Sequence, residues 1–308
     1  MPDIANKRVL VTGAAGFIGT RLLARLVGDG ARVFALDRVP VANTQIERAF
    51  CGDIADANAL RTAVRESAPD VVFHLAASLV RSSELLAFRH AIEANLLVTL
   101  SLVEAMQAEC VDARLVAMGT SEEYGTAPCP FDEGERESPV SAYSLSKLAM
   151  TRMLETLSRV QGLPVTIIRP SLAYGPGQRP NMFVPALIAA ILEGREFPTT
   201  PGEQTRDFVY VDDLVDALVR ASVSDAALGR VINIGSGDAV RICDLATTVE
   251  RLAGVSGLVK LGAIPYRAGE QMEYSVDSSL ARELIGWSAT TPLEEGLRRT
   301  IDAARSEA

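Results

Sequence analysis

The feature that most constrains the fold is the stretch RVLVTGAAGFIG at residues 8–19. Its apolar start predicts a strand that is buried on both faces, as in parallel sheets. Gly13, Gly16 and Gly19 follow as the pattern changes to that of a helix. In such a turn the first glycine permits a tight bend, the second lets the backbone approach a pyrophosphate, and the third lets the helix pack closely on the strand. The start of the helix also favours bound phosphate. An ordinary glycine-rich turn is the alternative.

A second predicted strand ends in Asp37, eighteen residues after Gly19. A carboxylate at this point can accept both hydroxyls of the adenosine ribose and repels a 2′-phosphate, which favours NAD over NADP. Arg38 beside it opposes this preference, because an arginine there can hold that phosphate. Asp53, just past the third strand, can meet the adenine amino group or serve as a turn aspartate.

Length and charge limit the class of protein. A chain of 308 residues is long enough for one large α/β domain, or for such a domain with an appended lobe. The formal net charge of −9 is unfavourable for binding nucleic acid or an anionic membrane. The longest uncharged run, 180–192, is too short to cross a bilayer. Because the first strand begins almost at the N-terminus, we also expect no signal peptide.

Cysteine and histidine usage predicts a cytoplasmic protein without a metal site. His74 and His90 are the only histidines, and no CxxC motif occurs. This leaves few ligands for a structural metal and argues against a histidine-based nucleophile. The scattered cysteines are expected to be reduced thiols; they are Cys51, Cys110, Cys129 and Cys243.

Strand and helix patterns alternate as far as about residue 170, which predicts right-handed βαβ units and a parallel sheet. The expected strands are 8–12, 32–37, 47–50, 71–75, 114–118 and 165–169, and the expected helices are 17–28, 56–67, 84–109 and 141–161. We therefore predict an α/β fold with a Rossmann-type doubly wound parallel sheet over residues 1–170. Residues 171–308 are expected to form mainly a smaller substrate-binding lobe, with segments that return to the main sheet.

The pattern loosens after residue 172. An apolar helix is expected near 183–192, then a short strand in RDFVYV and a helix capped by Asp212 or Asp213. Another strand in VINIGSG and a helix with one apolar face follow. We expect the cleft between this lobe and the sheet to lie at the carboxyl ends of the strands, where open α/β sheets bind ligands.

Tyr143 and Lys147 lie four residues apart at the start of a predicted helix, and therefore on one face of it. A phenol, with a reference pKa of about 10, is a poor base near neutral pH. An ammonium about 4 Å away contributes roughly 4 kcal/mol at an effective dielectric near 20, which brings the phenol pKa towards neutrality. Lys147 can also reach the nicotinamide ribose. Tyr143 would then exchange a proton with a carbinol while NAD exchanges the hydride. An exposed pair without a role is the alternative.

The predicted strand 114–118 ends in GTSEEYG, at an edge that faces the cofactor crevice. A hydroxyl of Thr120 or Ser121 can hydrogen-bond the reacting oxygen there and orient it towards Tyr143. Glu122 can act as a second acid or base, or it can be a solvated or capping glutamate.

The motifs VTGAAGFIG, VFHLAA, TSEEYG, YSLSK, RPSLAYGPG and RDFVYVDD occur together with Asp37 and Asn95. In this order they resemble the extended short-chain dehydrogenase/reductase family. Within that family they are most similar to the NAD-dependent nucleotide-sugar epimerases, dehydratases, 4-ketoreductases and decarboxylases. The resemblance covers nearly the whole chain and implies a nucleoside-diphosphate sugar as substrate and NAD as cofactor.

The resemblance also implies a role for each motif position. The catalytic positions would be Tyr143, Lys147, Thr120, Ser121 and Glu122. The cofactor-binding positions would be Gly13, Gly16, Phe17, Ile18, Gly19, Asp37, Arg38, Asp53, Ile54, Leu75, Ala76, Ala77, Asn95, Tyr143 and Lys147. The substrate-binding positions would be Ser78, Thr120, Asn181, Arg206, Arg267 and Glu270.

Among the substrate positions, Arg206 and Arg267 would grip the diphosphate and Glu270 would contact the nucleotide ribose. A net-acidic protein that binds a diphosphate needs arginines that project into its cleft. An ion pair between Arg206 and Asp207, or another neighbour, is the alternative.

Two departures from the family pattern bear on the reaction. Leu172 stands where many relatives have an asparagine that contacts sugar or phosphate. Ser121 stands where sugar 4,6-dehydratases commonly have aspartate, which favours a 4-epimerase or a 4-ketoreductase. Glu122 keeps a 4,6-dehydratase or a uronate decarboxylase open. A non-catalytic NAD-binding protein is a further alternative, although such proteins typically lose the tyrosine or the lysine.

The resemblance further implies a homodimer. In many relatives the helices that correspond to those beginning near Ser83 and Tyr143 pair as a four-helix interface. The apolar residues of these helices fit that arrangement, and they equally fit packing on the sheet.

Overall fold

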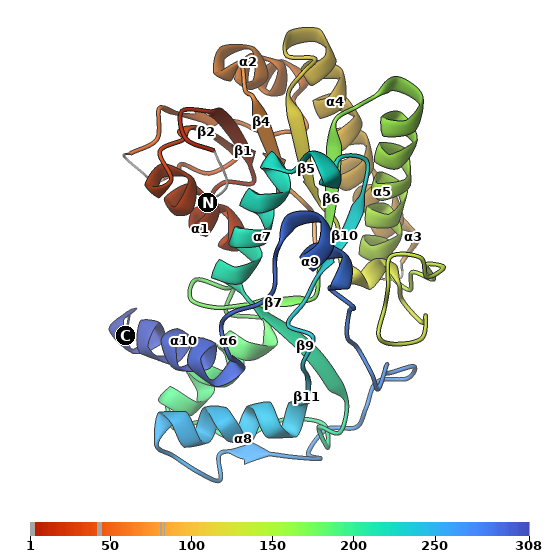
Figure 1. Cartoon of the computed structure of the whole chain (residues 1–308). Helices are drawn as coiled ribbons and strands as arrows, with labels where there is room; N and C mark the ends of the chain where they lie inside the picture. The colour runs from red at the N-terminus through yellow and green to blue at the C-terminus, as the bar shows by residue number, and fades with distance from the viewer. Residues whose placement is uncertain (1–3, 42–44, 81, 83, 308) are drawn as a thin grey trace.

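The computed structural model describes residues 4–41, 45–80, 82 and 84–307. In this part of the chain, seven parallel strands form the main sheet (Figure 1). In spatial order they are β10 (Val231–Ile234), β6 (Val165–Pro170), β5 (Arg114–Met118), β4 (Val71–His74), β1 (Arg8–Thr12), β2 (Arg32–Asp37) and β3 (Arg48–Cys51). The predicted Rossmann-type sheet is therefore confirmed.

The strand order reverses between β1 and β4, which lie side by side in the middle of the sheet. Their register pairs Thr12 with His74, so the loops that leave both strands begin next to each other. In doubly wound sheets this reversal opens a crevice at the carboxyl edge of the sheet. The fold thus brings the glycine-rich turn to the place where such sheets bind ligands.

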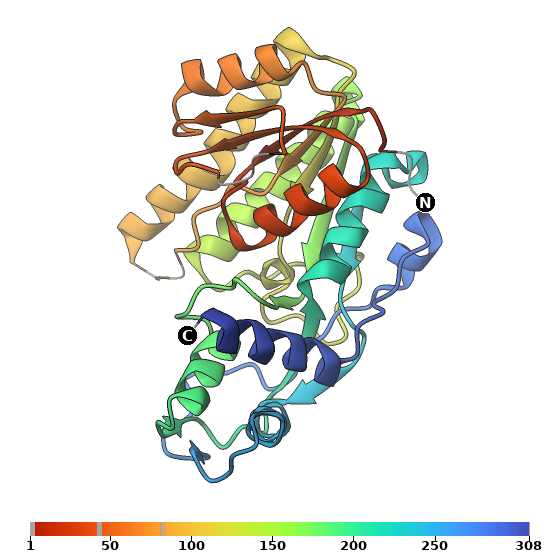
Figure 2. The ribbon, with the colours of Figure 1, turned by 90° about the vertical axis from the view of Figure 1, so that its left-hand side faces the viewer.

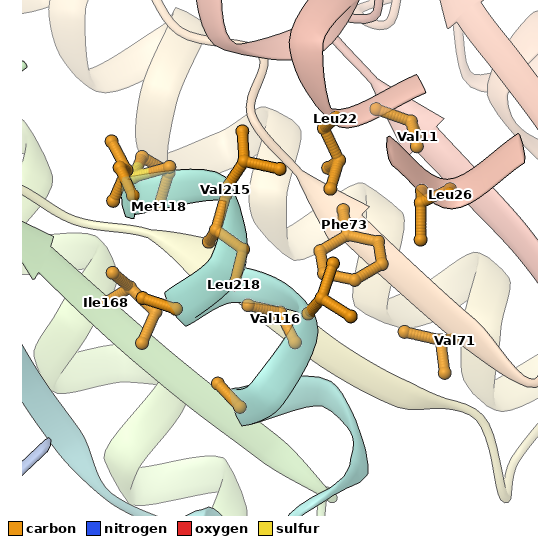
Figure 3. Close-up of a cluster of buried hydrophobic side chains, with 14 of the residues drawn as sticks. Val11, Leu22, Leu26, Val71, Phe73, Val116, Met118, Ile168, Val215 and Leu218 are labelled. Atoms are coloured by element: carbon orange, nitrogen blue, oxygen red, sulfur yellow. The ribbon is translucent and has the colours of Figure 1, made fainter. Parts of the chain in front are cut away.

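Helices cover both faces of the main sheet (Figures 1 and 2). One face carries α1 (Phe17–Gly28), α7 (Val211–Val223) and α9 (Ser279–Ile285), and the other carries α2 (Ala57–Ser67), α4 (Val98–Glu109) and α5 (Ala142–Gln161). Along β1, Val9 and Val11 pack towards α1 and α7, whereas Leu10 packs towards α2 and α4. Because both faces are buried, the strand needs apolar residues at consecutive positions. Figure 3 shows Leu22 of α1 and Leu218 of α7 in the hydrophobic cluster between the sheet and the helices α1 and α7.

The long helix predicted over 84–109 consists of three parts. They are α3 (Leu85–Ala91), a π-helical segment (Ile92–Leu97) and α4; Ser83, near its expected start, lies outside the described residues. By length and composition alone, Leu85–Glu109 could cross a membrane. In the structure its first two parts pack against α5, and its last part, α4, packs against α2.

A smaller lobe follows the main sheet in the chain, and it is built on a mixed three-stranded sheet. Its strands are β11 (Ala239–Arg241), β9 (Thr205–Tyr210) and β7 (Leu172–Tyr174), and its helices are α6 (Phe183–Leu192), α8 (Ile242–Ala253) and α10 (Leu293–Glu307). A short parallel pair adds β8 (Phe197–Pro198) and β12 (Val259–Lys260). Figure 1 shows this lobe below the main sheet, to which β10, α7 and α9 return.

The predicted cap of α7 is wrong. The helix begins directly after Tyr210, which occupies the N-cap position without a side-chain hydrogen bond. Asp212 and Asp213 lie inside the first turn instead. Asp213 accepts hydrogen bonds from Thr290 Oγ1 at 2.7 Å and from Thr291 N at 2.9 Å, so it anchors the C-terminal segment to α7. The short strand β7 was also not expected, because only three residues form it.

Candidate functional site

The turn between β1 and α1 is shaped by glycines that leave no room for side chains. Gly13 has a φ of +72°, and a Cβ there would lie 2.6 Å from the Ala76 nitrogen. A Cβ on Gly19 would lie 2.3 Å from the Gly13 carbonyl oxygen. Gly16 is the N-cap of α1, whose first turn has no side-chain cap and no acidic residue. The N–H groups at the start of α1 are therefore available to a phosphate.

Asp37 lies beside this turn at the end of β2. Its Oδ2 accepts a hydrogen bond from Ala15 N at 2.9 Å, so the carboxylate also fixes the glycine-rich turn. A carboxylate has further acceptor positions for ribose hydroxyls. The neighbouring Arg38 is exposed. Asp53 is exposed too, and its Oδ1 accepts a bond of 2.9 Å from the backbone N–H two residues on, as in the turn alternative.

The remaining predicted cofactor residues follow strand ends at the same edge of the sheet. Phe17 and Ile18 start α1, Ile54 follows β3, and Leu75, Ala76 and Ala77 follow β4. The loop after β4 is held by Asn95 from the π-helical segment. Asn95 Oδ1 accepts from Ser78 N at 2.8 Å, and its Nδ2 donates to Ser78 O at 3.1 Å and to Ser146 Oγ at 2.9 Å. The amide thus joins this loop to α5.

The start of α5 is fixed by reciprocal hydrogen bonds. Ser144 N donates to Ser141 Oγ at 3.1 Å, and Ser141 N donates to Ser144 Oγ at 3.0 Å. This capping box sets the first turn of α5, so that Tyr143 and Lys147 follow on one face. Tyr143 is 6% exposed and Lys147 is 1% exposed. Both side chains are buried, so an exposed pair does not describe them.

Lys147 carries a buried ammonium with little compensation from the protein. Among the described residues its only hydrogen-bond acceptor is the Met150 thioether, 3.6 Å from Nζ. Burial lowers the pKa of Lys147 to about 8, and the charge of Glu123 opposes this change. His74, held between Thr12 Oγ1 at 2.8 Å and Thr99 Oγ1 at 2.9 Å, has its pKa lowered to about 3 by burial and by Lys147. His74 is therefore neutral near pH 7.

Thr120 lies where β5 enters the short 3₁₀ turn Ser121–Glu123, which packs against α5. Its backbone N–H donates to Glu123 Oε1 at 3.0 Å. Its Oγ1 accepts a hydrogen bond from Glu122 N at 3.2 Å. Because the hydroxyl acts as an acceptor in this contact, its own hydrogen can be donated to a ligand.

Ser121 is oriented differently from Thr120. Its Oγ donates to the Pro170 carbonyl at 2.8 Å and lies 2.7 Å from the hydroxyl of Tyr274. Since the serine hydrogen is directed to Pro170, Tyr274 is the donor in the second contact. This arrangement favours Thr120 over Ser121 as the hydroxyl that meets a substrate. Glu122, between them and Glu123, is half-buried.

Two of the predicted substrate residues contact each other. Arg206 Nη2 forms an ion pair with Glu270, and Nη1 donates to Thr205 O at 2.8 Å and Gln271 O at 2.9 Å. The expected alternative partner, Asp207, instead accepts hydrogen bonds from Ser236. Of the other substrate positions, Thr120 is buried, Ser78 is half-buried, and Asn181 and Arg267 are exposed.

Sequence reasoning missed three residues of this site. His74 lies within VFHLAA, and that motif was its only signal. Glu123 lies within TSEEYG, but only its neighbour Glu122 was considered there as an acid or base. Tyr274 has no recognisable motif, and only the fold brings it from the C-terminal part of the chain to Ser121.

The described residues fit a dinucleotide. The uncapped start of α1 and the crowded glycines suit a pyrophosphate, and Asp37 suits a ribose with free hydroxyls. The buried Lys147 ammonium has only a weak acceptor of its own, so hydroxyl groups of a ligand would satisfy it. No cluster of three or more metal-ligating side chains occurs among the residues that the structure describes.

Comparison with known proteins identifies the family of the chain. The model of the NAD dependent epimerase/dehydratase family matches residues 9–235. The chain is 33% identical to a UDP-glucose 4-epimerase of Mycolicibacterium smegmatis, with 97% of this chain and 99% of that protein covered. It is 27% identical to dTDP-glucose 4,6-dehydratase 1 of Escherichia coli, with 96% and 92% covered. A solved structure of MoeE5 in complex with UDP-glucuronic acid and NAD is 36% identical, with a TM-score of 0.85 and coverage of 97% and 99%.

The chain belongs to the NAD dependent epimerase/dehydratase family. This confirms the resemblance to the extended short-chain dehydrogenases/reductases and identifies an NAD-dependent enzyme of the sugar-nucleotide epimerase/oxidoreductase type. The similar proteins include both 4-epimerases and 4,6-dehydratases.

Proposed function

We propose that this enzyme transfers hydride reversibly at C4 of a nucleoside-diphosphate hexose, as a 4-epimerase or a 4-ketoreductase. The observation that carries the proposal is the buried set of Tyr143, Lys147 and Thr120 at the carboxyl edge of the main sheet. The similarity to a UDP-glucose 4-epimerase supports it. Serine at position 121, where dehydratases commonly have aspartate, supports it as well.

Each residue of this set has a distinct task. Bound NAD supplies the hydride acceptor and, in the reverse direction, the hydride donor. Tyr143 takes the proton of the C4 hydroxyl as the C4 hydride leaves, and the Lys147 ammonium stabilises the phenolate form of Tyr143 that accepts this proton. Thr120 donates its hydroxyl hydrogen to the sugar oxygen and orients it. A 4-epimerase returns the hydride to the other face of C4 and the proton to the C4 oxygen, whereas a 4-ketoreductase makes one transfer for each exchange of cofactor.

The substrate diphosphate would bind Arg206 in exchange for Glu270. Arg206 is already held in place by two backbone carbonyls, so only its Nη2 contact with Glu270 has to change. The released Glu270 carboxylate can then accept hydroxyls of the nucleotide ribose. Arg267 and Asn181 would complete the substrate site from exposed loops.

A 4,6-dehydratase or a uronate decarboxylase is the second candidate. It is supported by the half-buried Glu122 next to Thr120 and by similarity to dTDP-glucose 4,6-dehydratases. A dehydratase needs proton transfer at C5 and C6 in addition to the C4 step. A non-catalytic NAD-binding protein has the least support, because both Tyr143 and Lys147 are present.

Product analysis tests the proposal. UDP-, dTDP-, GDP- and CDP-hexoses and the corresponding 4-ketosugars are incubated with the enzyme, with and without NADH, and the products are identified by NMR. We expect a C4 epimer without added reductant, or a C4 alcohol formed from a 4-ketosugar with NADH consumed. A 4-keto-6-deoxy product formed without reductant contradicts this version and supports the dehydratase.

We also propose a homodimer in which α3 and α5 meet their counterparts in a second copy. Leu85 and Leu86 of α3 are 85% and 77% exposed, and Leu97 is 49% exposed. Another side of α3 packs on α5, and this leaves an apolar stripe of the kind that pairs with another helix. Light scattering should give a dimer that L85E/L86E converts to a monomer. A monomeric wild type, or one that floats with liposomes, contradicts this arrangement.

We place the protein in the cytoplasm, without nucleic acid or membrane as a partner. Its four cysteines are free thiols, as expected in a reducing compartment. The net charge of −9 opposes binding to polyanions.

A further inference from the structure

Glu123 has a completely buried carboxyl group directly behind the Thr120 turn. Its Oε1 accepts the Thr120 backbone N–H at 3.0 Å, and its Oε2 accepts Arg169 Nε at 2.8 Å. A second guanidinium nitrogen, Arg169 Nη2, is also 2.8 Å from Oε2. Glu123 therefore joins a predicted catalytic residue to a buried arginine on β6.

The surroundings of Glu123 fit an ionised carboxylate. Its two oxygens accept hydrogen bonds from the N–H groups of Thr120 and Arg169, and the Thr151 hydroxyl also lowers the pKa of the carboxyl group. A carboxylic acid would need an acceptor for its own hydrogen. Burial raises the pKa of Glu123, and the charge of Arg169 opposes this effect. Arg169 is always protonated, and charge-assisted contacts of this kind favour the carboxylate.

A second carboxylate lies on the far side of the same arginine. Arg169 Nη2 donates to Glu137 at 2.8 Å, and Glu137 in turn pairs with Arg152 at the surface. Of the two carboxylates on Arg169, only Glu123 hydrogen-bonds Thr120 and raises the pKa of Lys147. Glu137 thus offers a matched control within the same ionic network.

The titratable groups near the Lys147 ammonium that affect its protonation come from three elements. His74 at the end of β4 is neutral, Tyr143 lies one turn earlier on α5, and Glu123 comes from the 3₁₀ turn. Of these, Glu123 is the group that favours the protonated lysine. Without it, a buried ammonium faces desolvation with only a thioether as acceptor.

We propose that Glu123 is a positioning residue for the C4 reaction, which acts on both partners of Tyr143. Its Oε1 fixes the Thr120 backbone. The 3₁₀ turn that carries Glu123 packs against α5, which carries Lys147, and the buried Glu123 charge favours the protonated form of Lys147. The inference rests on the proposed function in one respect only, the assignment of Tyr143, Lys147 and Thr120 as the reacting set. A simple structural ion pair with Arg169 is the rival explanation.

The test uses NAD binding measured by calorimetry between pH 6 and pH 10, without any sugar. If the Lys147 ammonium binds the cofactor, NAD affinity falls as Lys147 loses its proton. We call the pH at which NAD affinity begins to fall the break. In Glu123→Gln the break should lie about one pH unit lower than in the wild type. At a pH above the wild-type break, the variant should therefore bind NAD about tenfold more weakly than the wild type. In Glu137→Gln, which weakens the same network from the other side, the break should stay at the wild-type pH.

A break at the wild-type pH in Glu123→Gln, or an equal shift in both variants, overturns the inference. Glu123→Asp covers the case in which Glu123→Gln does not fold. This variant keeps the negative charge, but its shorter side chain moves the carboxylate oxygens away from the Thr120 backbone. The break should therefore stay at the wild-type pH while turnover falls several-fold. A shifted break again overturns the inference. Because no sugar is present, an active enzyme without the shift refutes only this inference. A shift in a protein that converts no sugar refutes only the proposed function.

Discussion

Replacing Lys147 by methionine should stabilise the protein without cofactor while it abolishes turnover. The ordinary lysine pKa of 10.5 falls to about 8 in the folded protein, where the side chain is completely buried. Between these pH values the unfolded chain binds more protons than the folded one, so the stability of the wild type rises with pH across this window. Below pH 8 the buried charge lowers the free energy of unfolding by about 3 kcal/mol, because each unit of difference between the unfolded and folded pKa of Lys147 corresponds to about 1.36 kcal/mol. Methionine has similar length and carries no charge.

Urea unfolding at several pH values between 7 and 10.5 measures this effect as the difference between the two proteins. At pH 7, Lys147→Met should be more stable by about 3 kcal/mol, and the difference should shrink towards zero near pH 10.5. Other groups that titrate in this range are common to both proteins and cancel. Saturating NAD should stabilise the wild type more than the variant. A variant that is less stable at pH 7, or a difference that does not change with pH, refutes the reasoning.

Three further substitutions test other parts of the site. Tyr143→Phe should lower turnover by roughly 10²–10⁴ while NAD still binds in calorimetry; equal turnover by variant and wild type would remove Tyr143 from the mechanism. Arg206→Ala should weaken binding of the nucleotide sugar far more than binding of NAD, and equal losses would contradict its role at the diphosphate. Gly19→Ala should abolish NAD binding, because its Cβ would lie 2.3 Å from the Gly13 carbonyl oxygen. Gly28→Ala in the same helix, where a Cβ meets nothing within 4 Å, should bind NAD normally.

The main sheet could be predicted because its elements are encoded locally. A strand buried on both faces needs consecutive apolar residues, and β1, β2 and β4 show such runs directly in the sequence. The breaks at Gly13 and Asp37 mark where the strands stop. The smaller lobe was harder to predict, because β7 and β11 have only three residues each and are defined by their pairing with β9.

The contacts of the site could not be predicted in this way. Arg169 meets Glu123 across 46 residues, Arg206 meets Glu270 across 64, and Ser121 meets Tyr274 across 153. Such pairs depend on which loops the topology brings together, and no local pattern encodes that. The alternative of an ion pair between Arg206 and a neighbouring residue does occur, but with Glu270 rather than with Asp207. In the extended strand β9, adjacent side chains point to opposite faces, so Asp207 faces away from Arg206.

The position of the Ser121 hydroxyl bears on the choice between C4 redox chemistry and dehydration. Elimination of water across C5 and C6 needs one group to remove a proton and another to protonate the leaving hydroxyl. In this chain the Ser121 hydrogen is directed to Pro170, and its oxygen is occupied by Tyr274. Glu122 would therefore have to serve both carbons, whereas the C4 step needs only Tyr143, Lys147 and Thr120. The arrangement around Ser121 thus matches the simpler reaction.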